Sequence, residues 1–236
     1  MGALLTRAVE RLDGDAAGRL GRITVEILGP VLRSEPVTVV AGVERPGRKI
    51  ALREATLAQA GPDGRPRDVA RARAWWVRER DTAAAVHRPG PVLRLPEPTA
   101  PSLFEASVPS SWRTGFIGSM QWRVVTPIGP GDTPAVAWSR MGVDLVEGEA
   151  ISDAQRAVAT ADTANGIGAR LDTRDWSFVN TELTVHLFDR PDAEWIGVEA
   201  ESAIGPHGIG TGSALLHGER GPFGRVTQCL LVEPVS

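Results

Sequence analysis

The stretch LTVHLF, Leu183–Phe188, repeats the pattern of an earlier stretch, ITVEIL, Ile23–Leu28, at positions 160 residues apart. In both, apolar residues alternate with polar ones, which is the two-residue period of a strand that buries one face. A helical run precedes each stretch, and strand-like runs follow each in nearly the same register. We interpret the chain as an internal duplication, the alternative being that strand-rich segments resemble one another through alternation alone.

Each half reads as one helix followed by several strands. The helices are expected over MGALLTRAVERL (1–12) and over Ser152–Arg170, where Ser152 and Gln155 fit a capping box. The expected strands, separated by turn signals such as GPDGRP, are 22–28, 36–44, 49–60 and 68–77 in the first half, and 119–125, 134–141, 178–188, 194–203, 208–218 and 224–232 in the second. Strands gathered after a helix predict an α+β fold, with an antiparallel sheet wrapped on each helix.

The boundaries of the two halves follow from proline content and from the helices. Residues 81–112 are rich in proline and lack periodicity, which predicts an extended linker between a first repeat at 1–80 and a second repeat at 113–236. The second half has two strand-like runs before its helix, whereas the first half begins directly at its helix. We therefore expect the leading strand of the first repeat to be absent.

Composition excludes several classes of function. The 236 residues carry a net charge of −3, which gives no electrostatic footprint for a nucleic-acid partner. No apolar run of about 18 residues is present to insert into a membrane. The single cysteine, Cys229, excludes an internal disulfide and suits the cytoplasm. The four histidines lack metal-ligand spacing, so we expect neither a metal nor a cofactor.

The order of the helix, NTELTVHLFDRP, EWIGVEAES and GRVTQCLLVEP resembles the double-hotdog acyl-CoA thioesterases of the thioesterase II (TesB-like) type. The resemblance spans most of the chain and is strongest from Ser152 onward. In that family an Asp on the second helix, a Thr or Ser that opens the next strand and a Gln on the last strand hold a hydrolytic water. The resemblance implies the corresponding catalytic set Asp162, Thr181 and Gln228, and further assembly of chains into a homo-oligomer.

The residue pattern supports the placement of these three side chains. Asp162 lies at spacings of three and four from apolar helix positions, so it falls on the stripe that should face the sheet. Alternation along the strand places Thr181 on the same face as Leu183 and Val185. A buried carboxylate needs hydrogen-bonding partners, and burial would raise its pKa and improve it as a base toward water. The structural alternative is that Asp162 only ends a helix before Asn165.

The first half provides a comparison. The offset of 160 places Gly21 opposite Thr181, and aligning WWV (75–77) with LLV (230–232) places Arg73 opposite Gln228. The first helix shows no carboxylate at the corresponding place. We therefore expect one active site per chain, at the junction of the halves, with the first half completing the acyl and CoA pocket.

Together these features predict a hydrolase of lipid metabolism that cleaves a fatty acyl-CoA to the free acid and CoA without a covalent intermediate. The alternative from another class is a non-catalytic acyl-CoA-binding or scaffolding hotdog protein, which release of free thiol would distinguish. A hotdog hydratase would need an Asp and His dyad, which the sequence does not show.

Overall fold

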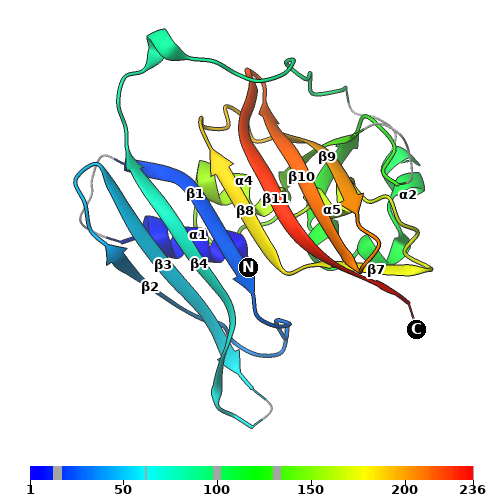
Figure 1. Ribbon diagram of the computed structural model, residues 1–236, viewed down its shortest axis with the longest axis horizontal. Helices are drawn as coiled ribbons and strands as arrows, with labels where there is room; N and C mark the ends of the chain where they lie inside the picture. Colours follow the sequence, from blue (N-terminus) through cyan, green and yellow to red (C-terminus); the bar gives the residue numbers. More distant parts are fainter. Residues whose placement is uncertain (13–17, 62, 98–101, 130–133, 236) are drawn as a thin grey trace.

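A single antiparallel sheet of 11 strands forms the body of the molecule (Figure 1). The computed structural model describes the chain except residues 13–17, 62, 98–101, 130–133 and 236. The strand order is β2-β3-β4-β1-β8-β11-β10-β9-β6-β5, and β7 also pairs with β11. The strands of the first repeat are β1 (Gly18–Ile27), β2 (Thr38–Arg45), β3 (Ile50–Ala60) and β4 (Pro66–Arg78). Those of the second are β5 (Met120–Val124), β6 (Ala135–Met141), β7 (Trp176–Asn180), β8 (Glu182–Leu187), β9 (Ile196–Ile204), β10 (Ile209–Gly218) and β11 (Gly221–Pro234).

The two stretches that revealed the duplication lie side by side at the centre of this sheet. β1 pairs with β8, with Ile23 opposite Val185 and Val25 opposite Leu183. Thr24 lies opposite its own counterpart, Thr184, and their hydroxyl oxygens are 3.1 Å apart. The order β2-β3-β4-β1 is thus mirrored by β9-β10-β11-β8 about this pair of threonines. The internal duplication is confirmed as a local two-fold arrangement, and β6 and β5 extend the second repeat alone.

The sheet wraps two helices that pack against each other, α1 (Gly2–Glu10) and α4 (Asp153–Ala161). Figure 1 shows both behind the central strands. The capping prediction is confirmed on one side, since the Ser152 hydroxyl accepts a hydrogen bond from the Gln155 amide at 3.1 Å. The predicted continuous helix to Arg170 is wrong: α4 ends at Ala161, and a separate turn, α5 (Ala164–Ile167), follows against β9 and β10. Helix formers give way there to Asn165, Gly166 and Gly168, which have low helix propensity.

The core lies between the helices and the sheet. Alternation along the central strands buries Ile23 and Val25 of β1 and Leu183 and Val185 of β8, while Leu5, Val9 and Val158 face them from the helices. Gly2 permits the close approach of the helices, because a methyl group on it would lie 2.9 Å from a Val158 methyl. The α+β class predicted from the sequence is therefore confirmed.

In the described part of the segment predicted as a linker, residues 81–97 and 102–112, the chain forms no strand. The segment between the repeats contains the short turns η1 (Ala83–Ala85), α2 (Ser102–Ser107), η2 (Ser110–Trp112) and α3 (Gly115–Gly118). In Figure 1 it runs as a teal trace from the end of β4 across the edge of the sheet to the second repeat. Among the described residues, no helix is both long enough and apolar enough to span a bilayer.

Candidate active site

Asp162 lies where α4 ends and the chain turns into α5. It is the C-cap of α4, and its amide donates to the Val158 carbonyl at 3.3 Å. The neighbouring Ala161 is fully buried, whereas Asp162 is partly exposed and lines a cavity of about 300 Å³. Four aromatic and apolar side chains line one part of the wall, Trp112, Phe116, Ile117 and Phe178, and Thr114, Thr163, Asn165 and Gly166 line the remainder. Asp162 therefore lines a cavity with aromatic, apolar and polar walls, whereas the helical spacing predicted only that it faces the sheet.

The side chain that contacts Asp162 is Asn180 rather than Thr181. Asn180 Nδ2 donates to Asp162 Oδ1 at 3.3 Å, a distance at the long end for such a bond. Thr181 is exposed, and its hydroxyl donates to the Cys229 carbonyl at 3.3 Å. The structure therefore does not bring Thr181 into contact with Asp162, and places its neighbour there.

A β-bulge explains this displacement. Asn180 lies opposite Leu230, and Thr184 lies opposite Thr227, so three residues of one strand face only two of β11. The extra residue breaks the two-residue alternation, and Asn180 consequently shares the inner face with Leu183. The prediction counted alternation back from Leu183 without the bulge. The sequence carries little signal for it, because Thr181 and Glu182 are compatible with a regular strand.

Gln228 is buried on the inner face of β11, with 1% of its surface exposed. Its Nε2 and Oε1 atoms are both buried, and neither has a hydrogen-bond partner among the described residues. Gly212 lies opposite it on β10, where a methyl group would sit 3.3 Å from Gln228 Oε1 and 3.5 Å from the Asn165 Cα. Gly212 thus lies between the amide and Asn165 of α5, which follows Asp162 by three residues. An unpaired buried amide costs about 1–3 kcal/mol, which a bound water or ligand would offset.

A further polar group, Ser202, lies on the same row of the sheet. Gly212 has Gln228 opposite it on one side and Ser202 on the other. The Ser202 hydroxyl oxygen is buried and, like the Gln228 amide, has no partner in the part of the chain that the structure describes. Sequence reasoning missed Ser202, although it follows the inward positions Val198 and Ala200 at the two-residue period of β9.

Electrostatics favour a carboxyl group that holds its proton more tightly than usual. Burial raises the pKa of Asp162, and the Met1 ammonium group and the Asn180 hydrogen bond oppose this only in part. A carboxylate with a raised pKa is a better proton acceptor, which suits a general base. No group of three His, Cys, Asp or Glu side chains that could hold a metal ion occurs within the described ranges.

The corresponding place in the first repeat is filled. Because Thr24 corresponds to Thr184, the strand pairings make Leu20, Arg53 and Ala74 the counterparts of Asn180, Gly212 and Gln228. Arg53 is 1% exposed, donates to the Val9 carbonyl at 2.6 Å and lies 4.1 Å from the centre of the Trp76 ring. Its long side chain extends from the position that Gly212 occupies in the second repeat, where even a methyl group would lie 3.3 Å from Gln228 Oε1.

In the predicted comparison of the two halves, one residue match is correct and the other is wrong. Gly21 does match Thr181, since Gly21 is the extra residue of a bulge in β1. Arg73, however, is exposed and pairs with Glu44, so the predicted alignment was one residue out of register and the buried counterpart of Gln228 is Ala74. The C-cap of the first helix is Arg11, where α4 has Asp162, and the last helical residue, Glu10, accepts hydrogen bonds from Ser152 at 2.8 Å and Gln155 at 2.6 Å.

Comparison with known proteins gives this geometry its context. The chain shares its fold with the tesB protein of Mycobacterium avium subspecies paratuberculosis, at 16% identity, with 98% of this chain and 85% of that one covered and a TM-score of 0.66. A conserved hot dog fold protein from Alicyclobacillus acidocaldarius matches at 16% identity over 100% of this chain and 86% of its own, with a TM-score of 0.72. The acyl-CoA thioesterase II TesB2 of Mycobacterium marinum matches at 14% identity over 97% and 85%, with a TM-score of 0.66.

The double-hotdog architecture is thereby confirmed. Among curated proteins, no sequence matches the chain. Two family models do match it: the acyl-CoA thioesterase N-terminal domain over residues 1–77 and the acyl-CoA thioesterase C-terminal domain over residues 91–232. The second of these covers more than half of the chain, so this protein belongs to the acyl-CoA thioesterase family of hydrolases.

Proposed function

We propose that the protein hydrolyses fatty acyl-CoA thioesters in the cavity at Asp162, with a single active site per chain. The observation that carries this proposal is the buried, unpaired amide of Gln228, which Gly212 separates from Asn165, three residues after a carboxylate of raised pKa, Asp162. Such an amide is costly unless something binds to it, and a water held between it and Asp162 would offset that cost. The single-cysteine composition suits a cytoplasmic setting.

In the proposed reaction, Asp162 accepts a proton from water while the water oxygen attacks the thioester carbonyl carbon. Collapse of the tetrahedral intermediate breaks the carbon–sulfur bond, and the proton passes to the departing thiolate. The products are the free acid and CoA, so no covalent intermediate on the chain is needed. Asn180 and Gln228 orient the water, and Asn180 takes the role that the family resemblance gave to Thr181.

The wall of the cavity supports an apolar acyl group as the ligand. Trp112 and Phe178 meet edge to face with their ring centres 5.8 Å apart, and Phe116 and Ile117 of α3 complete the apolar side. A cavity of about 300 Å³ is at the lower end of the range for small-molecule sites. We expect acyl chains of medium length to fit better than long ones.

The test is a panel of acyl-CoA substrates of increasing chain length, scored by release of free thiol from the purified protein. We expect release from at least one substrate without added metal, and a maximum at medium chain length. If no substrate of the panel releases thiol but the same substrates bind saturably, the result would support a non-catalytic acyl-CoA-binding protein instead. Activity that disappears with a chelator and returns with zinc would contradict the metal-free reaction.

A further inference from the structure

A second and larger cavity, of about 550 Å³, lies beneath the segment that joins the repeats. Its wall comes from residues 80–89 of that segment, from Arg19 at the start of β1, from Phe188 and Asp189 after β8, and from Arg225 of β11. It shares no lining residue with the cavity at Asp162. Its volume is within the range of sites that hold cofactor-sized ligands.

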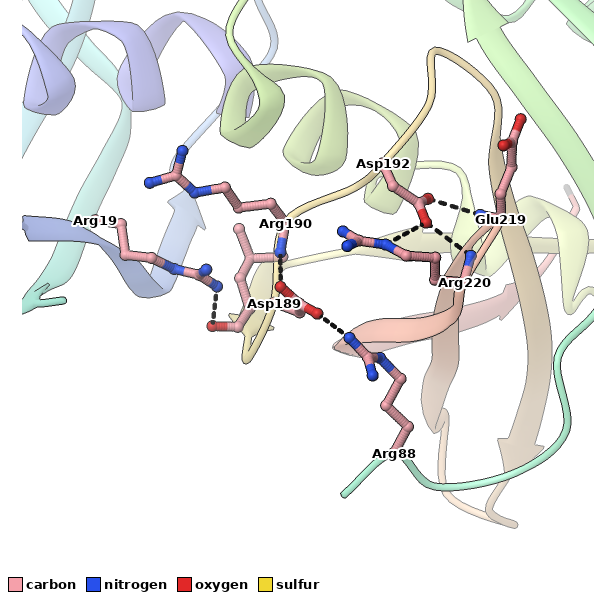
Figure 2. Close-up of polar contacts among 8 residues, drawn as sticks. Arg19, Arg88, Asp189, Arg190, Asp192, Glu219 and Arg220 are labelled. Carbon is pink, nitrogen blue, oxygen red and sulfur yellow. Dashed lines mark hydrogen bonds and ion pairs between the residues drawn. The ribbon is translucent and has the colours of Figure 1, made fainter. Parts of the chain in front are cut away.

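Positive charge dominates the wall of this cavity. Four guanidinium groups line it, from Arg19, Arg80, Arg88 and Arg225, against the carboxylates of Asp81 and Asp189. Figure 2 shows how Asp189 is engaged: the Arg88 guanidinium pairs with one of its oxygens, and the Arg190 amide donates to the other at 2.8 Å. These contacts lower the pKa of Asp189, although its partial burial opposes them. Asp189 is thus ionised and already paired.

The other three arginines lack such a partner. The guanidinium of Arg19 is half-buried and makes one long hydrogen bond, at 3.4 Å, to the Leu187 carbonyl (Figure 2). Burial lowers the pKa of Arg19, and the nearby positive charge of Arg190 also lowers it, against the attraction of Asp189. Arg80 and Arg225 form neither an ion pair nor a hydrogen bond with any described residue. A half-buried cation without a close counter-ion is unfavourable, so an anion in this cavity would be stabilising.

We propose that this cavity is a binding site for a phosphate ester of nucleotide size. Arginine matches phosphate oxygens with paired N–H groups, and several arginines around one cavity suit a ligand that carries more than one negative charge. Apolar side chains at the same wall offer a surface to a base, since Phe188 is 46% exposed and Val86 is 59% exposed. A single inorganic phosphate would leave most of the 550 Å³ and the Phe188 ring without contacts.

None of the residues of this cavity takes part in the proposed reaction, so its occupancy can be measured separately from thioester hydrolysis. Two sources could supply the same chemistry: the phosphorylated adenosine diphosphate end of a CoA molecule, or a free nucleotide. Adenosine 3′,5′-bisphosphate carries the base and two phosphates without a thioester or an acyl chain. Its binding therefore reports on the arginine-lined cavity and not on turnover at Asp162.

The experiment is titration calorimetry of the full chain with adenosine 3′,5′-bisphosphate at low and at moderate salt. We expect one molecule to bind per chain, with an affinity that falls as salt screens the charges. The double variant Arg80→Met and Arg225→Met should raise the Kd by about tenfold or more, since it removes two charge-assisted contacts. The matched control is Arg48→Met, which removes an exposed arginine from the turn between β2 and β3 and should leave the Kd unchanged.

Further measurements distinguish CoA from a free nucleotide as the ligand, and the contribution of the base from that of the phosphates. Displacement of the bisphosphate by CoA assigns the site to the nucleotide end of CoA, whereas lack of displacement assigns it to a free nucleotide. Phe188→Ala should weaken the bisphosphate but not inorganic phosphate, with the thermal midpoint confirming that the variant folds. Equal affinity for inorganic phosphate and the bisphosphate would overturn a nucleotide-sized ligand. No binding, or equal loss in Arg48→Met and the double variant, would overturn the site.

Discussion

Asp162 is the base in the proposed reaction, and its substitution separates a catalytic role from a structural one. Asp162→Asn keeps the shape of the side chain but removes the base. We expect turnover to fall by about 100-fold or more, because a positioned general base contributes about that much. The free energy of unfolding should stay level or rise by about 1 kcal/mol, since a poorly solvated charge is lost. Thiol release and the thermal midpoint are measured on one preparation; normal turnover would remove Asp162 from the mechanism.

The raised pKa of Asp162 also fixes the sign of two pH dependences. Turnover should fall with decreasing pH at a midpoint above the ordinary aspartate value of about 3.9, because the base must be ionised. Between that value and the raised pKa, the native state binds more protons than the unfolded state, so the stability of the wild type decreases as pH rises. As pH rises through this window, the free energy of unfolding of Asp162→Asn should therefore increase relative to that of the wild type, and above the window the difference should stay constant. Thermal unfolding of both proteins in a series of buffers of increasing pH measures this difference.

At the scale of elements, the bulge between β7 and β8 decides whether Asn180 or Thr181 faces Asp162. Asn180→Ala should lower turnover by roughly 10- to 1000-fold, the range for loss of one positioned polar group. Thr181→Ala should change turnover by less than about threefold, because its hydroxyl contacts only the Cys229 carbonyl. Steady-state thiol release on both variants is the measurement. The reverse order of effects would place Thr181 in the site and Asn180 outside it.

The same element shows where sequence reasoning succeeds and where it stops. Alternation in β1 and β8 predicted their buried faces, because that pattern is local. The bulge at Thr181 and the end of α4 at Ala161 depend on pairing with β11 and on packing against β9, which lie far along the chain. Gln228 was found through the family resemblance, whereas Asn180 and Ser202 became visible only when the strands were brought together.

The whole molecule is one sheet that passes through both repeats, so we expect the repeats to unfold together. β1 pairs with β8, and α1 packs on α4, which leaves neither repeat with a complete core of its own. Thermal unfolding followed by far-UV circular dichroism and by tryptophan fluorescence should give a single, coincident transition. Two separated transitions would show that each repeat is stable alone, and the predicted boundary at residues 81–112 would then divide independent domains.

Arg53, which occupies the position of Gly212 in the first repeat, bears on how the chain evolved and on how it could be engineered. A duplicated gene starts with two equivalent centres, and one copy can then drift once the other suffices for survival. Here the first repeat differs both at the helix end, where Arg11 stands in the place of Asp162, and at a few positions on the inner strands. Arg53→Gly, Leu20→Asn and Ala74→Gln would restore the polar residues of the active copy at the matching positions. With Arg11→Asp added for the proposed base, four substitutions give a design for a chain with two equivalent centres.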